Sequence, residues 1–247
     1  MIKEFAFGIN KRHHFHDANK YGEFMGTKHD TFCSLFDYDK SVIEFFSKNK
    51  SLSGFNGPIS VPDEFILDVD GPEFDVAITK SQKLSILLDQ LEVSYILYFS
   101  GRGFHFGIPE AAFKWAADQN LHVYMKKELT AKGIFEYADA SVSDKTRLIR
   151  VNNTKNSKSN LYKVEIKHDW LFHENAKELI VNCAQVPRKL LKREPVVQKP
   201  VFDILPRNTQ KVESVEEAIT YSEPAYKPDP INYPCIQGML STVKIGQ

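Results

Sequence analysis

The chain has 247 residues, of which 42% are hydrophobic and 12% aromatic, enough to bury one full-sized core. Its 32 basic and 32 acidic residues cancel, which excludes a global positive field, so any contact with nucleic acid must come from local clusters of charge. Three widely separated cysteines argue against a disulfide framework and predict an intracellular location. The sequence has neither the apolar leader that would predict a signal peptide nor the apolar run of about 18 residues that would predict a membrane span.

The first clear elements of the chain are a strand, a helix and a hairpin. The apolar run FILDV, residues 65–69, lies between Pro62 and Gly71 and predicts a buried strand. Thr79 and Gln82 form a capping-box pattern, which predicts a helix over KLSILLDQL with its leucines on one face. The runs SYILYF and FHFGI are strand-like and are joined by Ser-Gly-Arg-Gly, so they predict a hairpin.

The following segments complete a mixed pattern of helices and strands. Pro109 and Glu110 open a stretch of helix-forming composition that closes at Gly133, and this stretch predicts one or two helices over the sheet. RLIRV and LYKVEI are predicted strands, and DWLFHENAKELIVNC is a predicted final helix capped by Asp169. The predicted fold class is therefore α+β.

The distribution of proline divides the chain. Eight of its 12 prolines fall between Pro187 and Pro234, where repeated X-Pro steps oppose both helix and central strand. We therefore predict a main domain over residues 1–183, a proline-rich linker with a basic start over residues 184–230, and the beginning of a C-terminal module over residues 231–247.

Two aspartates end the strand predicted over residues 65–69. Asp68 and Asp70 are two residues apart, so both carboxylates project from one face of the sheet. Like charges at that separation repel unless one carboxyl is protonated or a divalent ion bridges the pair, and hard oxygen ligands select Mg²⁺ or Mn²⁺. The alternative is a solvated strand end.

The turn of the predicted hairpin, SGRGFHF, has the composition of a phosphate-binding loop. Two glycines allow the backbone to approach a ligand closely and leave amide groups free to face phosphate oxygens. His105 lies between two phenylalanines, so its side chain points to the face opposite theirs. The alternative is an ordinary hairpin with a hydrogen-bonded histidine.

These motifs, in this order, resemble those of the archaeo-eukaryotic primase superfamily. A strand ending in Asp-x-Asp and a later Ser-Gly-Arg-Gly-x-His turn are similar to its first two motifs. The third motif is a further carboxylate followed by basic residues, which Asp139, Arg147, Arg150 and Lys155 match, with Asp144 as the competing carboxylate. The resemblance covers residues 51–166 and is closest to primase-polymerases of phage, plasmid and mobile-element type.

The resemblance implies a template-dependent DNA primase or polymerase, a nucleotidyltransferase of DNA replication that works by a two-metal mechanism. It implies an RRM-like active-site sheet beside an N-terminal α/β subdomain. It also implies two Mg²⁺ or Mn²⁺ ions, a single-stranded or primed DNA template, dNTP or NTP, and a replicative helicase fused or in trans. The metal ligands and catalytic residues would be Asp68, Asp70 and Asp139; the nucleotide-binding residues would be Ser100, Arg102, Gly103, His105, Arg147, Arg150 and Lys155.

Two other functions fit the same residues. A metal-dependent nuclease would use three carboxylates and a histidine to activate water. A catalytically inactive module that binds single-stranded or origin DNA is the second alternative, although clustered carboxylates do not help a surface to bind phosphates.

The end of the sequence, NYPCIQGMLSTVKIGQ, is similar to the start of a cysteine-bearing C-terminal module of primases. A zinc or iron–sulfur site needs about four ligands, and this segment supplies Cys235. The remaining ligands are therefore expected beyond Gln247, in a longer protein. The alternative is a free structural cysteine near a true C-terminus.

Overall fold

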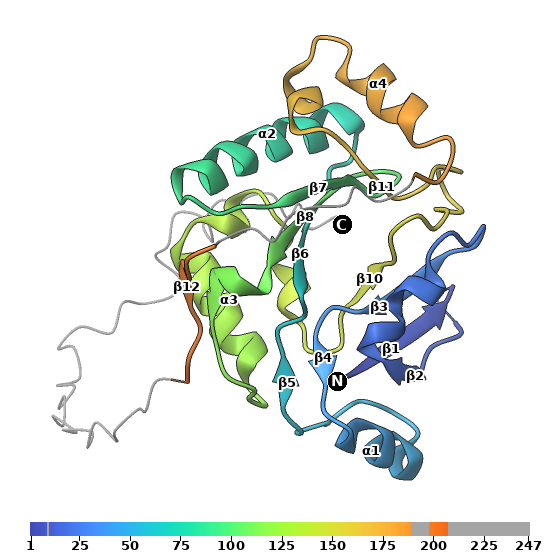
Figure 1. The fold of residues 1–247 in the computed structure, drawn as a ribbon, viewed down its shortest axis with the longest axis vertical. Coiled ribbons are helices and arrows are strands. Elements are labelled where there is room, and N and C mark those ends of the chain that lie inside the picture. The colour runs from blue at the N-terminus through green and yellow to red at the C-terminus, as the bar shows by residue number, and fades with distance from the viewer. Residues whose placement is uncertain (9, 189–197, 207–247) are drawn as a thin grey trace, which may run out of the picture. The chain divides into compact units, whose positions relative to one another are not determined.

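The computed structural model describes residues 1–8, 10–188 and 198–206, which form two antiparallel sheets, a parallel pair of short strands, and helices around them (Figure 1). This arrangement is α+β, as the sequence predicts. No helix within the described residues is long and apolar enough to cross a membrane.

The first sheet is built mainly from the N-terminal part of the chain. Its order is β10-β3-β1-β4-β5, and β2 also pairs with β1. Helix α1, Ser41–Asn49, lies between β4 and β5 in the sequence. Strand β10 comes from much later in the chain and joins this sheet beside β3. The strands are β1 Ile2–Phe7, β2 His14–Asp17, β3 Thr31–Ser34, β4 Asp37–Tyr38, β5 Ile59–Ser60 and β10 Leu148–Arg150.

The second sheet contains the predicted strand and hairpin. Its order is β11-β7-β8-β6, with every pair antiparallel. Helix α2, Phe74–Gln90, packs on one face of this sheet (Figure 1). On that face the ring of Phe74 contacts the rings of Phe99 and Phe104. The predictions of a strand over 65–69 and of the hairpin are confirmed. The strands are β6 Glu64–Val69, β7 Ile96–Phe99, β8 Phe104–Pro109 and β11 Val164–Glu165.

The predicted start of the second helix is wrong. α2 begins at Phe74, and Thr79 lies inside it, where its hydroxyl donates to the carbonyl of Asp75 instead of capping the helix. Serine and threonine inside helices commonly make this bond to the preceding turn, so a capping-box pattern alone does not locate a helix start.

The helical stretch predicted from Pro109 is only partly helical. α3 spans Leu121–Ala131, whereas Glu110–Ala112 forms a 3₁₀ turn and Phe113–Lys114 forms strand β9. β9 pairs in parallel with β12, Phe202–Asp203, a partner far along the chain, so its strand conformation comes from a tertiary contact.

The predicted last helix is also shorter, because α4 spans Ala176–Cys183 and Asp169 lies in a preceding 3₁₀ turn rather than at its N-cap. The 3₁₀ turns are Ala18–Phe24, Glu110–Ala112, Ile134–Glu136, Ala140–Ser143 and His168–Phe172.

Part of the predicted proline-rich linker is packed on the fold. Phe202 and Ile204 are fully buried, and the ring of Phe202 stacks on Phe113 with 5.1 Å between centroids. The predicted C-terminal module with Cys235, and the linker over residues 189–197 and beyond residue 206, lie outside the described residues.

Candidate functional site

The two sheets face each other across a cleft that contains most of the predicted site residues. Side chains alternate along a strand, so Asp68 of β6 points away from the face that α2 covers. The register of β6 and β8 places His105 directly opposite Asp68. On the other side of the cleft, β10 supplies Arg150, and Arg147 directly precedes the strand. The cleft has a volume of about 380 Å³.

Asp68 and His105 form a buried pair at the base of this cleft. His105 Nε2 lies 3.3 Å from Asp68 Oδ1. Burial, together with the charge of Lys163, lowers the pKa of His105 to about 4, so the imidazole is neutral at neutral pH. Burial favours the neutral acid at Asp68, but contacts with His105 and Arg147 outweigh it and lower the pKa of this carboxyl group.

Asp70 has the opposite environment. Burial raises its pKa, and the negative charges of Asp68 and Asp139 raise it further. Its side chain lies against the hairpin turn, where a Cβ atom on Gly103 would overlap Asp70 Oδ1. Gly103 thus accommodates a carboxylate of the protein itself, while Gly101 has the positive φ of +98° that a tight turn requires.

The loop before β10 brings the third predicted carboxylate beside Asp68. The backbone amide of Asp139 donates to the carbonyl of Asp68 at 2.7 Å. Arg147 Nη2 lies 3.5 Å from Asp68 Oδ2 and 3.3 Å from Asp139 Oδ2, so this guanidinium group bridges the two carboxylates. The competing Asp144 is exposed, and its side chain accepts a hydrogen bond from the amide of Thr146.

The basic side of the cleft includes contacts that the sequence did not predict. Arg150 Nη1 lies 2.6 Å from Asp30 Oδ1, and its guanidinium carbon is 4.7 Å from the ring centre of Phe32. Asp30 is 120 residues from Arg150 in the sequence, so no local pattern links them.

One predicted basic residue lies elsewhere. The ammonium group of Lys155 is 5.7 Å from the ring of Tyr162, and Lys155 is not among the residues that line the cleft, whereas Lys158 is. The polar run NNTKNSKSN contains both lysines, so its composition could have indicated either. The cleft is lined by Asp30, Phe32, Asp68, Asp70, Gly71, Ser100, Arg102, His105, Arg147, Leu148, Ile149, Arg150, Asn156, Ser157 and Lys158.

The carboxylates match a divalent cation in chemistry. Hard oxygen donors suit Mg²⁺ or Mn²⁺, and the pKa of Asp70, raised first by burial and then by the charges of Asp68 and Asp139, shows negative charge that a cation would offset. However, the described residues contain no group of three or more histidine, cysteine or carboxylate side chains already arranged to hold a metal ion. Arg147 bridges two of the three predicted ligands.

Comparisons with known proteins are sparse for this chain. No family model matches it. No curated protein matches it either. Among solved structures, it is similar to the polymerase domain from Mycobacterium tuberculosis Ligase D in complex with DNA, with 9% sequence identity and a TM-score of 0.39. The match covers 63% of this chain and 60% of that one, less than two thirds of the latter, and a TM-score this low does not define a common fold.

Proposed function

We propose that this chain is a template-dependent nucleotidyltransferase, a DNA primase or polymerase of the archaeo-eukaryotic primase superfamily. The main support is the cleft itself, in which carboxylates on one sheet face two arginines carried by the other. Transfer of a nucleotide from a triphosphate needs such a pairing, because positive groups must hold the phosphates while negative groups hold the cations that accompany them.

The arginines would hold the triphosphate. Guanidinium groups bind phosphate oxygens in a bidentate manner, and Arg102 and Lys158 add positive charge to the same cleft. Arg147, which precedes β10, already contacts Asp68, and Arg150 of β10 already contacts Asp30. A bound triphosphate would compete for these guanidinium groups and would free the carboxylate of Asp68. We therefore expect the binding of nucleotide and of cation to reinforce each other.

The carboxylates of Asp68, Asp70 and Asp139 would hold divalent cations. The resemblance to the primase superfamily implies two such ions. Such ions supply activation of a 3′-hydroxyl group and neutralisation of charge on the phosphates. His105 would act through Asp68: its buried neutral imidazole, with Nε2 3.3 Å from Asp68 Oδ1, would fix the orientation of the carboxylate. Ser100 and Gly103 would shape the turn that faces the phosphates, since the Gly103 amide donates to Ser100 Oγ.

The experiment is incorporation of labelled dNTPs and NTPs on primed and unprimed single-stranded DNA with Mn²⁺ or Mg²⁺. Asp70→Ala and Asp139→Ala should lose incorporation by several orders of magnitude, because each removes a proposed cation ligand. Asp144→Ala is the matched control from the same loop and should retain most activity. Incorporation that survives Asp139→Ala but not Asp144→Ala would mean that Asp144 is the third ligand.

A DNA-binding module without turnover is the second candidate. The observation that favours it is the bridge from Arg147 to Asp68 and Asp139, which already neutralises part of the acidic cluster without a cation. The same assay separates the two functions, since binding of single-stranded DNA with neither incorporation nor loss of template would identify the module. Loss of template without incorporation would identify a nuclease.

A further inference from the structure

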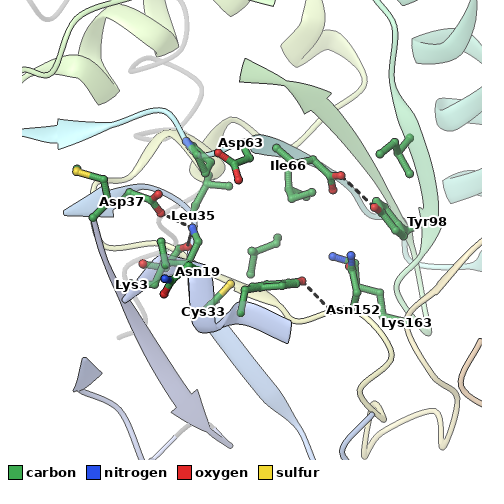
Figure 2. Close-up of a pocket in the computed structure, with 18 of the residues that line it drawn as sticks. Lys3, Asn19, Cys33, Leu35, Asp37, Asp63, Ile66, Tyr98, Asn152 and Lys163 are labelled. Carbon is green, nitrogen blue, oxygen red and sulfur yellow. Dashed lines mark hydrogen bonds and ion pairs between the residues drawn. The ribbon is translucent and has the colours of Figure 1, made fainter. Parts of the chain in front are cut away.

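A second and larger cavity lies between the same two sheets, next to the cleft. Figure 2 shows side chains that line this cavity. Its volume is about 540 Å³, within the range of roughly 300–1,000 Å³ that is typical of small-molecule pockets. Ile149 of β10 lines both the cavity and the cleft, so the two share one wall. The proposed nucleotidyl transfer makes no use of this cavity.

The walls of the cavity are mainly apolar. Ile66 and Ile96 come from the second sheet. On the opposite side, Ile149 belongs to β10 of the first sheet and Leu35 directly follows β3 of that sheet. Tyr98 adds an aromatic ring (Figure 2). Apolar walls on two opposing sheets, one of which carries an aromatic ring, suit a flat ligand with little polar surface on its faces.

Within the cavity, Asn152 offers a buried acceptor that lacks a donor. Asn152 is 6% exposed, and its Oδ1 accepts no hydrogen bond from the part of the chain that the structure describes. Its backbone amide, by contrast, donates to the hydroxyl group of Tyr21 at 2.9 Å. Buried acceptors are normally hydrogen-bonded, so Asn152 Oδ1 calls for a donor brought by a ligand or a water molecule.

The polar groups near Asn152 are held in place by other contacts. Tyr98 donates to Glu64 Oε2 at 3.0 Å, and the Glu64 side chain lies so close over Gly107 that a Cβ atom there would overlap it. Lys163 donates to the carbonyl of Arg150 at 2.9 Å, and its ammonium group lies 4.9 Å from the centre of the Tyr98 ring. These groups are fixed before any ligand arrives, which reduces the entropy lost on binding.

The charge of the cavity excludes strongly anionic ligands. The lining side chains include two lysines and four carboxylates: Lys3, Lys163, Asp37, Asp63, Glu64 and Glu165. Lys3 is already paired with Asp37, with 2.5 Å between Nζ and Oδ1. A triphosphate would meet an excess of negative charge, whereas an uncharged ligand that carries N–H donors would meet acceptors.

We propose that this cavity binds an uncharged heterocycle that carries an amino group, of the nucleobase or nucleoside class, with the amine donating to Asn152 Oδ1 and the ring between the walls that contain Ile66 and Ile149. Amide and carboxylate oxygens are the groups that recognise the exocyclic amines of adenine and cytosine elsewhere in proteins. The proposal concerns a site apart from the cleft and does not depend on nucleotidyl transfer.

The test is calorimetric titration of the protein with adenosine and with cytidine, with ATP as the charged comparison. Ile66→Trp should abolish binding by filling the cavity, and Asn152→Leu should weaken it by about tenfold or more by removing the acceptor. Val123→Trp is the matched control, because Val123 is 50% exposed on α3. Asp70→Asn, in the cleft, should leave nucleoside binding unchanged.

The outcomes separate clearly. Binding of at least one of the two nucleosides that is lost in Ile66→Trp, weakened in Asn152→Leu and kept in Asp70→Asn supports the site. If neither nucleoside binds up to its solubility limit, or if binding persists in Ile66→Trp, the proposal is overturned. Binding that Asp70→Asn removes would place the nucleoside in the cleft and would also overturn the proposal.

Thermal unfolding of each variant checks that the variant is folded. Since Asn152→Leu nearly preserves side-chain volume, this variant remains informative if Ile66→Trp does not fold. Nucleotide incorporation is measured separately, so either proposal can fail alone.

Discussion

Lys163 should make the stability of the protein depend on pH in the alkaline range. The residue is 1% exposed, and burial lowers the pKa of its ammonium group from 10.5 to about 8. Between those two values the unfolded chain retains a proton that the folded protein has released. The unfolded state therefore binds more protons in this window, and the free energy of unfolding contributed by Lys163 rises with pH.

The size of the effect follows from the shift in pKa. Each unit of pKa difference corresponds to about 1.4 kcal/mol, so a shift from 10.5 to about 8 is worth roughly 3 kcal/mol across the whole window. Several buried phenols and one buried thiol act in the opposite sense, and Cys33 and Tyr95 are two of them. Burial raises the pKa of the Cys33 thiol and raises that of Tyr95 to about 12, so their unfolded forms release protons first and stability falls as pH rises.

Comparison with Lys163→Met removes most of the other contributions, because the phenols and the thiol are present in both proteins. Loss of the lysine charge also raises the pKa of the nearby Cys33 thiol, and the measured difference includes this smaller effect. Methionine keeps an unbranched chain and fills similar space without a charge. Urea unfolding at about pH 7.5, 8.5 and 9.5 measures both proteins. Relative to the variant, the wild-type protein should gain up to about 1.4 kcal/mol of unfolding free energy per pH unit above pH 8. Parallel pH profiles would refute the reasoning and would mean that the ammonium group is hydrated in the folded protein.

Three further changes test other parts of the fold by urea unfolding. Gly103→Ala should cost about 1–3 kcal/mol because its Cβ would overlap an aspartate oxygen, whereas Gly22→Ala, which has nothing within 4 Å, should have little effect; equal costs would contradict the tight contact. Phe202→Ala should cost about 3–5 kcal/mol, and an unchanged midpoint would show that this segment does not stabilise the fold. Arg12→Met should lower the free energy of unfolding by about 3–5 kcal/mol, because the Glu4 carboxylate, whose side chain is 0% exposed, would lose the guanidinium group that donates two hydrogen bonds to it. Arg12→Lys should recover part of this loss, and no recovery would argue against a charge effect.

Features that depend on neighbouring residues were predictable from the sequence. The strand over residues 65–69 and the hairpin of β7 and β8 follow from short apolar runs and a glycine-rich turn, and the two strands of the hairpin are adjacent along the chain. The proximity of Asp68 and His105 follows once β8 of this hairpin is paired with β6. Alternation of side chains then places both residues on the same face.

Features that depend on distant partners were not predictable. Phe113 belongs to a segment of helical composition, yet it forms a strand because Phe202 pairs with it. The ion pair between Arg150 and Asp30 joins residues from different parts of the chain, and the bridge from Arg147 to Asp139 depends on the exact path of the loop before β10. Sequence spacing identifies which charges are available but does not determine which of them meet.

The position of β10 in the first sheet also bears on the order in which the protein folds. Until this strand is synthesised and docked, β3 presents a free edge of unpaired backbone groups, the kind of edge that other chains can join. The docking of β10 closes that edge, and in the same step brings Arg147 to Asp68 of the second sheet and Arg150 to Asp30, which directly precedes β3. A nascent chain that ends before Leu148 would therefore have both an aggregation-prone edge and an acidic cleft without its counter-charge, and a single long-range pairing removes both problems.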